Sequence, residues 1–279
     1  MTLKRYPNGV GREFFYEKDA PAFTPAWVKI FPVPRRRGGP DIRYIIINDC
    51  ATLAWCASIA AIELHPFLHR APRLDKSTIV AFDLDPGEGA DVLTCAEVAF
   101  RLKDVLDRLE LQSFAKVSGS KGLQVYVPLN TGTRYEQTQP FARNLARLLE
   151  RRYPELLVAD MDKRLRTGKV FIDWSQNSDF KTTVAAYSLR AKRDRPFVSM
   201  PVTWSDLKRA LDKRNADQLL FAPTAAIRRV RARGDLFAPV LRLKQRLPDN
   251  FATELEVGRP ARRSSAKQPA APSAPRRSH

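Results

Sequence analysis

Cysteine, histidine and long apolar runs are scarce in this sequence. It contains three cysteines and three histidines among 279 residues. Cys50, Cys56 and Cys95 have neither the spacing of zinc ligands nor an even number for pairing, so we expect reduced thiols in the core of a cytoplasmic protein. Because one of the three histidines is the last residue, a Ser/His/Asp triad has little support. No apolar run reaches the length of a membrane span, so we expect no membrane-spanning segment.

Acidic residues are also few relative to basic ones. The chain has 30 aspartates and glutamates against 48 lysines and arginines, which gives a net charge of +18. Six of the basic residues and no acidic ones lie in 258–279, so +12 remains on the rest of the chain. A basic body of this size predicts a polyanionic partner, most simply nucleic acid. An anionic membrane surface and a merely soluble basic protein are the alternatives.

Apolar residues make up 44% of the chain, enough for a substantial core. Their spacing predicts strands and helices without regular alternation, which favours an α+β fold with mixed or antiparallel sheets flanked by helices. We expect one domain over 1–251 and a disordered basic tail over 252–279. The expected strands are 43–47, 78–85, 169–174, 183–189 and one on each side of 118–122; the expected helices are 50–64 (buried), 205–211, 223–233, one beginning with a capping box at 94–97 and one around 141–149.

Two aspartates in the predicted strand 78–85 form the most informative pattern. Side chains alternate along a strand, so Asp83 and Asp85 share one face, opposite the apolar residues before and between them. Adjacent carboxylates repel each other, and a divalent cation such as Mg²⁺ or Mn²⁺, which prefers oxygen ligands, removes that repulsion. Ordinary turn chemistry at 85–87 is the alternative, and it accounts for Asp85 but not for Asp83.

The segment 118–122 (SGSKG) is a glycine-rich turn between two predicted strands. Its small residues would let backbone amides approach an anion, with hydroxyl donors from Ser118 and Ser120 and a positive charge from Lys121. It is not a Walker loop, because the wide glycine spacing is missing. A hairpin with a solvated lysine is the alternative.

A third acid, Asp173, lies in the predicted strand 169–174. It could be an edge carboxylate that faces water. Together with Asp83 and Asp85 it would form a cage able to hold two cations about 3.5–4 Å apart, the geometry of two-metal phosphoryl transfer. In that chemistry one cation activates an attacking hydroxyl and the other stabilises the leaving pyrophosphate.

Basic and aromatic residues could complete such a site. Arg166, Lys181 and Arg190 could neutralise a triphosphate, although surface solvation is the alternative for each. His65 and His69 have the i, i+4 spacing of some zinc sites but no third ligand, so a phosphate or hydroxyl contact from His65 is the better interpretation. The aromatics at 14–16 could stack on a base or pack in the core.

Several segments, in matching order and spacing, resemble the polymerase domain of bacterial ATP-dependent DNA ligase D, of the archaeo-eukaryotic primase superfamily. The resemblance runs from about residue 3 to residue 250. It rests on 4–10 (KRYPNGV), 63–65 (ELH), 82–89 (FDLDPGEG), 118–122 (SGSKG), 168–177 (GKVFIDWSQN), 181–183 (KTT), 186–190 (AYSLR) and 201–204 (PVTW).

The resemblance implies a primase-like catalytic core that adds nucleotides, in this family typically ribonucleotides, to a DNA 3′-OH during bacterial non-homologous end joining. It implies two Mn²⁺ or Mg²⁺ ions at Asp83, Asp85 and Asp173. The implied partners are DNA ends or gapped DNA, NTP or dNTP, Ku and a separate DNA ligase, in a cytoplasmic, nucleoid-associated protein. The positions that it assigns to the incoming nucleotide are Lys4, Phe15, Tyr16, His65, Ser118, Lys121, Arg166, Gln176 and Arg190, and those that it assigns to DNA are Arg35, Arg36 and Arg37.

Two features depart from the family pattern. Gln124 stands where the turn motif commonly has histidine, which predicts weaker triphosphate affinity. The family usually has a segment before the motif at 4–10, with lysines that hold a 5′-phosphate at a gap, so we expect altered end recognition. The alternative function is therefore a catalytically weak module that binds and bridges DNA ends. A hydrolase with an Asp-x-Asp nucleophile is a further alternative, but it needs neither the turn nor Asp173.

Overall fold

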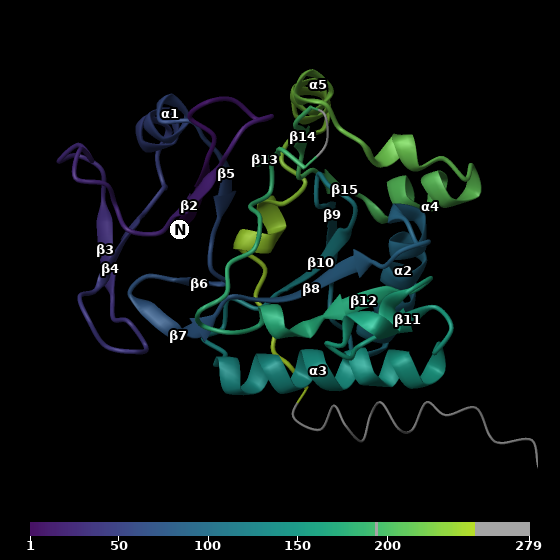
Figure 1. Ribbon diagram of the computed structural model, residues 1–279. Helices are drawn as coiled ribbons and strands as arrows, with labels where there is room; N and C mark the ends of the chain where they lie inside the picture. Colours follow the sequence, from purple (N-terminus) through teal and green to yellow (C-terminus); the bar gives the residue numbers. More distant parts are fainter. Residues whose placement is uncertain (193–194, 249–279) are drawn as a thin grey trace, which may run out of the picture.

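A six-stranded sheet forms the centre of the computed structural model, which describes residues 1–192 and 195–248 (Figure 1). Its strand order is β11-β12-β8-β10-β9-β15, and every neighbouring pair is antiparallel except β11 and β12. The strands predicted around 78–85, 118–122 and 169–174 are thereby confirmed. The sheet consists of β8 (Ile79–Pro86), β9 (Phe114–Val117), β10 (Leu123–Pro128), β11 (Leu157–Val158), β12 (Val170–Asp173) and β15 (Pro201–Val202).

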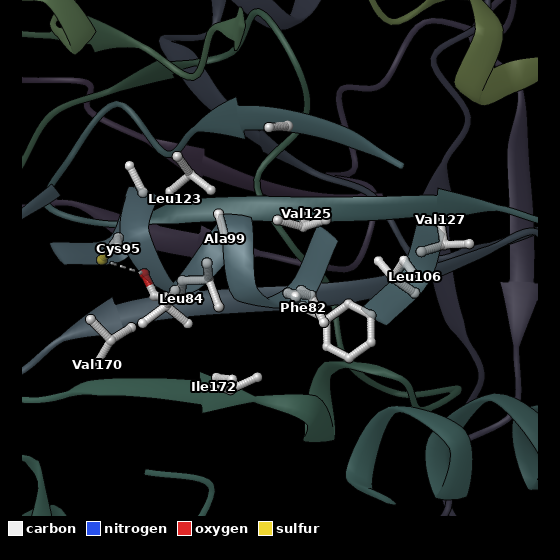
Figure 2. Close-up of a cluster of buried hydrophobic side chains, with 14 of the residues drawn as sticks. Phe82, Leu84, Cys95, Ala99, Leu106, Leu123, Val125, Val127, Val170 and Ile172 are labelled. Carbon is white, nitrogen blue, oxygen red and sulfur yellow. Dashed lines mark hydrogen bonds between the residues drawn. The ribbon is translucent and has the colours of Figure 1, made fainter. Parts of the chain in front are cut away.

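One face of this sheet is apolar and is covered by two long helices, α2 (Val92–Arg108) and α3 (Tyr135–Arg152). Figure 2 shows Phe82 and Leu84 of β8 beside Val125 of β10 and Ile172 of β12, with Ala99 of α2 packed among them. All five side chains are fully buried. Because side chains alternate along each strand, the residues between these positions face away from the helices.

The helix α2 begins earlier than predicted. Asp91 is its N-cap and accepts hydrogen bonds from the backbone N–H groups of Leu93 and Thr94, while Thr94 completes the capping box. The predicted box at 94–97 is therefore wrong by three residues. An aspartate already available at the preceding loop satisfies the first amide groups of the helix, so the helix starts there.

The first sixty-five residues build a smaller lobe beside the large sheet (Figure 1). Its three-stranded sheet has the order β2-β1-β5, and a separate hairpin and one helix complete it. A small core holds the lobe together, centred on Leu3, Ile45 and Cys56. The elements are β1 (Thr2–Arg5), β2 (Phe15–Glu17), β3 (Ile30–Val33), β4 (Ile42–Ile45), α1 (Cys50–Ser58) and β5 (Ala61–His65), followed by the hairpin β6 (His69–Arg70) and β7 (Arg73–Ser77).

The buried helix predicted over 50–64 is wrong. The helix α1 ends at Ser58, and residues 61–65 instead form β5, which pairs with β1. The helix is also largely exposed: Leu53 is 47% exposed, and Cys50 is exposed whereas Cys56 is buried. Pairing with a strand sixty residues earlier in the chain decides the conformation of 61–65, and helical periodicity carries no information about such a partner.

The last described elements complete the large lobe. The strand predicted over 183–189 is wrong, because only Leu189–Arg190 pair, as β13 with β14 (Phe197–Val198). The helices predicted at 205–211 and 223–233 are confirmed as α4 (Trp204–Asp212) and α5 (Pro223–Arg233), and the remaining turns are η1 (Lys163–Arg166), η2 (Trp174–Gln176), η3 (Ala216–Leu219) and η4 (Ala238–Leu241). The predicted tail at 252–279 lies outside the described residues. None of the helices in the described part of the chain could span a membrane.

Candidate active site

A row of polar residues crosses the face of the large sheet that the helices leave free. Asp173 of β12 lies opposite Asp83 of β8 in the strand register. Asp83 in turn lies opposite Gln124 of β10, and Gln124 lies opposite Lys116 of β9. Antiparallel pairing therefore brings together two acids that are ninety residues apart in the sequence. Lys116 is a member of this row that the sequence reasoning did not identify.

The surroundings of Asp83 and Asp85 destabilise the charged forms of these two acids. Burial raises the pKa of Asp83, and the neighbouring carboxylate of Asp85 raises it further. The pKa of Asp85 is also raised, first by the protein atoms that crowd the carboxyl group and then by Asp173, although part of the side chain reaches solvent. Hard carboxylate oxygens that repel each other are a donor set suited to Mg²⁺ or Mn²⁺. The chemistry of the residues therefore fits a divalent metal.

The carboxylate of Asp173 is held by its own loop in this conformation. Its Oδ1 accepts hydrogen bonds from the backbone N–H and the hydroxyl of Ser175, at 2.9 and 2.5 Å. Its Oδ2 accepts one from Gln176 Nε2 at 3.2 Å and lies 3.8 Å from Lys181 Nζ. Within 1–192 and 195–248, no three His, Cys, Asp or Glu side chains are grouped closely enough to hold a metal ion. The predicted three-carboxylate cage thus stays a prediction, which requires Asp173 to exchange these partners for a cation.

The loop after β12 is fixed to the sheet by Asn177. Its side-chain Oδ1 accepts a hydrogen bond from Ala81 N–H at 2.9 Å, and its Nδ2 donates to Ala81 O and Trp174 O, both at 2.8 Å. The amide side chain thus replaces a neighbouring strand at β8. This anchor holds η2, and with it Gln176, beside Asp173.

A cavity of about 500 Å³ opens between the polar row and the small lobe. It brings together four residues predicted from the resemblance to surround a nucleotide, and it contains Asp83 as the one predicted metal ligand among its lining residues. The lining residues are Thr2, Tyr16, Lys18, His65, Asp83, Gln124, Gln176, Thr182, Thr183, Val184 and Arg190. The cavity therefore has an acidic floor from the sheet and basic or neutral donors from the opposite side.

Gln124 is firmly held in this cavity. Its Nε2 donates to Thr183 Oγ1 at 2.8 Å, and its Oε1 accepts from the hydroxyl of Tyr126 at 3.1 Å. The amide can still hydrogen-bond through its second N–H, but unlike an imidazole it cannot carry a positive charge.

Two arginines flank the end of the row near Asp85. Arg166 stacks on Phe171, 3.7 Å from the ring centroid, and its charge works against the rise in the pKa of Asp85. Arg190 packs against the turn at Gly119, which has φ +73°, and a Cβ there would lie 3.1 Å from Arg190 Cγ. The fold thus brings both predicted arginines to the acidic cluster.

The turn at 118–122 is a compact hairpin beside Asp85. The Ser118 hydroxyl accepts backbone N–H bonds from Ser120 and Gly122, both at 3.2 Å. Gly122 is required because a Cβ at this position would lie 2.3 Å from Leu84 O. Lys121 is exposed at the tip of the turn. A hairpin with an exposed lysine is thus present, and phosphate binding by that lysine stays a prediction.

Five of the nine residues that the resemblance assigned to the nucleotide are not among those that line the cavity: Lys4, Phe15, Ser118, Lys121 and Arg166. Lys4 is fully buried, with its Nζ 3.7 Å from the ring centroid of Phe14. Phe15 and Tyr16 are neighbours on β2 and face opposite sides of the sheet, where Phe15 lies against Arg5. Of these two residues only Tyr16 lines the cavity, and the assignment of Phe15 to the nucleotide stays a prediction.

The basic loop of Arg35, Arg36 and Arg37 is exposed, as predicted. Arg36 donates to Asp179 at 3.0 Å, and its guanidinium lies 4.3 Å from the ring centroid of Phe180. The loop therefore reaches the segment that follows β12. Its contact with DNA stays a prediction.

His65 and His69 serve different surroundings, which excludes a shared metal between them. His65 lies 3.3 Å from Glu63 and lines the cavity. His69 stacks on Phe67 and lies 3.0 Å from the Tyr135 hydroxyl.

Lys116, Glu63 and the cavity-lining Lys18 are charged residues that sequence reasoning did not assign to the site. Lys116 is fully buried, donates to Ser199 Oγ at 2.7 Å, and has its pKa lowered by burial, against the opposing effect of Asp83. The sequence does contain a signal for Lys116, because it is the single charged residue in the otherwise apolar strand 114–117. Asp173 was identified from the same kind of pattern. Glu63 was noted only as part of a resembling segment.

The model of the LigD primase-polymerase domain family matches residues 1–237. The chain belongs to this family. Its fold agrees with a solved member, the polymerase domain of Mycobacterium tuberculosis ligase D in complex with DNA, with a TM-score of 0.77 and 37% identity over 86% of this chain and 83% of that one. The predicted primase-like α+β core is therefore confirmed.

Other LigD proteins are similar over most of the chain. The multifunctional non-homologous end joining protein LigD of Mycolicibacterium smegmatis is 41% identical over 209 residues, which cover 74% of this chain and 27% of that protein. The bifunctional non-homologous end joining protein LigD of Bacillus subtilis is 30% identical over 250 residues, which cover 89% of this chain and 39% of that protein. The chain thus spans well under half the length of these LigD relatives.

Proposed function

We propose that this LigD-type primase-polymerase domain is a metal-dependent nucleotidyltransferase that adds nucleotides, with ribonucleotides favoured, to a DNA 3′-OH in non-homologous end joining. The observation that carries the proposal is the cross-strand meeting of Asp83 with Asp173, beside Asp85 and at the floor of a cavity with basic groups opposite. In the reaction, the 3′-oxygen bonds to the α-phosphorus while the bond between that phosphorus and pyrophosphate breaks.

The residues that line the cavity would contact different parts of a nucleoside triphosphate. Arg190 and Lys18 offer positive charge to phosphate oxygens, and His65 offers a ring nitrogen. The ring of Tyr16 provides a surface against which a base or sugar can pack. Gln176 keeps Asp173 in place from the side of the loop.

Asp83, Asp85 and Asp173 are the residues that would hold Mn²⁺ or Mg²⁺. A divalent cation, when bound, lowers the pKa of an attacking hydroxyl and offsets the negative charge that develops on the phosphate. The register of β8 and β12 places Asp173 opposite Asp83 on the free face of the sheet, beside Asp85, so these acids would be the ones available to a cation there.

The proposed nucleic-acid partner is a DNA end or a gapped duplex. The net charge of +18 favours a polyanion, and the mycobacterial neighbour was solved with DNA. The relatives named for non-homologous end joining support a role in that repair, with Ku and a separate DNA ligase as proposed partners.

A catalytically weak DNA-end-binding module is the second candidate. The observation that favours it is that the Asp173 carboxylate is already bound within its own loop, by hydrogen bonds from Ser175 and Gln176 and by an ion pair with Lys181. Such a module would bind ends without extending them.

Primer extension on a gapped duplex separates the two candidates. The assay compares Mn²⁺, Mg²⁺ and a chelator, and NTPs with dNTPs. We expect extension only with a divalent cation and faster extension with NTPs. End binding without extension under every condition would favour the second candidate and overturn the first.

A further inference from the structure

Glu63 is a buried acid that joins several segments of the small lobe to the cavity. It lies on β5, and its side chain is 1% exposed. Burial alone would raise its pKa, but the hydrogen bonds from His65, Tyr6 and the Ala191 N–H outweigh this and lower the pKa to about 2. Glu63 is therefore a carboxylate whose negative charge is kept by its neighbours.

The two oxygens of Glu63 serve different sides of the structure. Oε1 accepts from the Tyr6 hydroxyl, from Ala191 N–H at 3.0 Å and from Lys4 Nζ at 3.4 Å. None of these three donors lines the cavity. Oε1 is thus the anchored end of the carboxylate, held by three donors from two separate segments, the end of β1 and the chain after β13.

The other oxygen, Oε2, faces the two groups that do line the cavity. His65 Nε2 and Arg190 Nε each lie 3.3 Å from it. Because a carboxylate only accepts, the Nε2 of His65 carries the proton in this contact, which leaves Nδ1 as an acceptor when the ring is neutral. Oε2 therefore determines the tautomer of His65 and attracts Arg190 by charge, since Arg190 Nε has no hydrogen-bond partner among the described residues.

The charges around Glu63 do not balance. Lys4 and Arg190 bring two positive charges against its single negative charge, so the cluster keeps a positive surplus. Arg190 presents this surplus to the cavity. An anion in the cavity completes the balance, and Glu63 remains behind the basic groups without touching that anion.

A purely stabilising role explains this cluster poorly. A buried ion-pair network is weak evidence for stability, since apolar side chains of similar volume often stabilise a core equally well. What apolar side chains cannot supply is a fixed negative charge that faces two groups of the cavity wall, the His65 ring and the Arg190 guanidinium.

We propose that Glu63 is a positioning residue of the nucleotide pocket, anchored through Oε1 so that Oε2 holds His65 and Arg190 toward the triphosphate. This inference rests on the proposed function for the identity of the ligand. It adds to that function the residue that orients the pocket's basic wall.

The decisive variant is Glu63→Gln. Its amide oxygen can take the place of Oε1, while its NH₂ group would face the donors of His65 and Arg190 and displace them. We expect the KM for NTP to rise about 10-fold or more, with a much smaller change in kcat at saturating NTP. The Kd of ATP with Mn²⁺, measured by calorimetry without DNA, should rise by a similar factor.

Tyr6→Phe is the matched control. It removes one donor at the anchored oxygen and leaves both contacts of Oε2, so its KM and Kd should stay within about twofold of wild type despite a comparable loss of thermal stability. Glu63→Asp keeps the charge but withdraws the oxygens by one methylene. A positioning role predicts that its KM stays raised, whereas a role in charge balance alone predicts that Asp restores it.

Three results would overturn the inference: equal KM changes in Glu63→Gln and Tyr6→Phe, a wild-type KM in Glu63→Asp, or tighter ATP binding by Glu63→Gln. If Glu63→Gln does not fold, the Glu63→Asp and Tyr6→Phe pair decides. The proposed function fails separately, through absence of primer extension by the wild-type chain, while the ATP affinities still test the positioning of the pocket.

Discussion

The two faces of strand β8 come from alternating residues of one short segment, but they differ in burial and in charge. Phe82 and Leu84 point under the helices and are fully buried, whereas Asp83 and Asp85 point to the free face. The apolar face gains free energy from burial, and the polar face contains carboxylates whose pKa values are raised first by burial and then by their neighbouring carboxylates. One strand thus stabilises the fold on one side and accepts an electrostatic cost on the other, which is the pattern expected of a site that binds cations.

The largest effect is expected from the polar face. Asp85→Ala or Asp173→Ala should reduce primer extension below detection, because each removes a proposed metal ligand. The affinity for DNA, measured in the absence of nucleotide, should stay near that of the wild type. Extension at the normal rate by Asp173→Ala would show that the acid belongs to its own loop rather than to a metal site.

The apolar face should respond in the opposite way. Phe82→Ala should lower the free energy of unfolding by about 3–5 kcal/mol, because it leaves a cavity among α2, β8 and β12. Chemical denaturation measures this loss. Under conditions in which the variant is folded, its extension rate per folded molecule should remain close to that of wild type, and a loss as deep as that of Asp85→Ala would contradict the division between the faces.

The turn beside Asp85 offers a test at the rim of the polar face. Lys121→Ala should raise the KM for NTP roughly 10-fold, because it removes a positive charge directed at phosphate. Steady-state kinetics of primer extension provide the measurement, and Lys76→Ala, which changes another partly exposed lysine outside the cavity, provides the control. Equal KM values for the two variants would favour a solvated lysine at the tip of a structural hairpin.

Gln124 tests whether the polar face has adapted to its amide. Gln124→His should lower the KM for NTP by a few-fold if the family's histidine contributes an added donor or charge. Loss of affinity would instead show that the bonds of Gln124 to Thr183 and Tyr126 shape the pocket. The same kinetic assay distinguishes these outcomes.

The smallest effect is a pH dependence of stability near the hairpin of β6 and β7. Burial lowers the pKa of His69 to about 4, whereas an unfolded histidine titrates near pH 6.5. As the pH falls from about 6.5 to 4, the unfolded state takes up a proton that the folded state excludes, so the free energy of unfolding falls across this window. Denaturation at several pH values should show that the free energy of unfolding changes less steeply with pH in His69→Gln than in wild type. The difference in slope should correspond to at most one bound proton. An unchanged slope would assign the pH dependence to other groups.

Local patterns were sufficient for much of the fold. The alternation in 78–85 predicted which side chains of β8 face the core, and the apolar spacing near 141–149 and 223–233 predicted two helices. The largest error has a tertiary cause. Residues 61–65 have an apolar composition that suits a helix as well as a strand, and pairing with β1 decided between them.

The candidate site also has some features that local sequence patterns determine and others that depend on the tertiary structure. The sequence by itself determined that Asp83 and Asp85 share a face, since alternation is a property of one extended strand. It also determined the glycine-rich turn and the family to which the chain belongs.

Only the tertiary structure decided which distant residues meet these acids. Strand register placed Asp173 opposite Asp83, and it added the buried Lys116 to the same row. Packing of the small lobe buried Lys4 and gathered three donors on one oxygen of Glu63. The physical reason is that alternation and turn chemistry act between neighbours in sequence, whereas register, burial and charge balance depend on partners that only folding brings near.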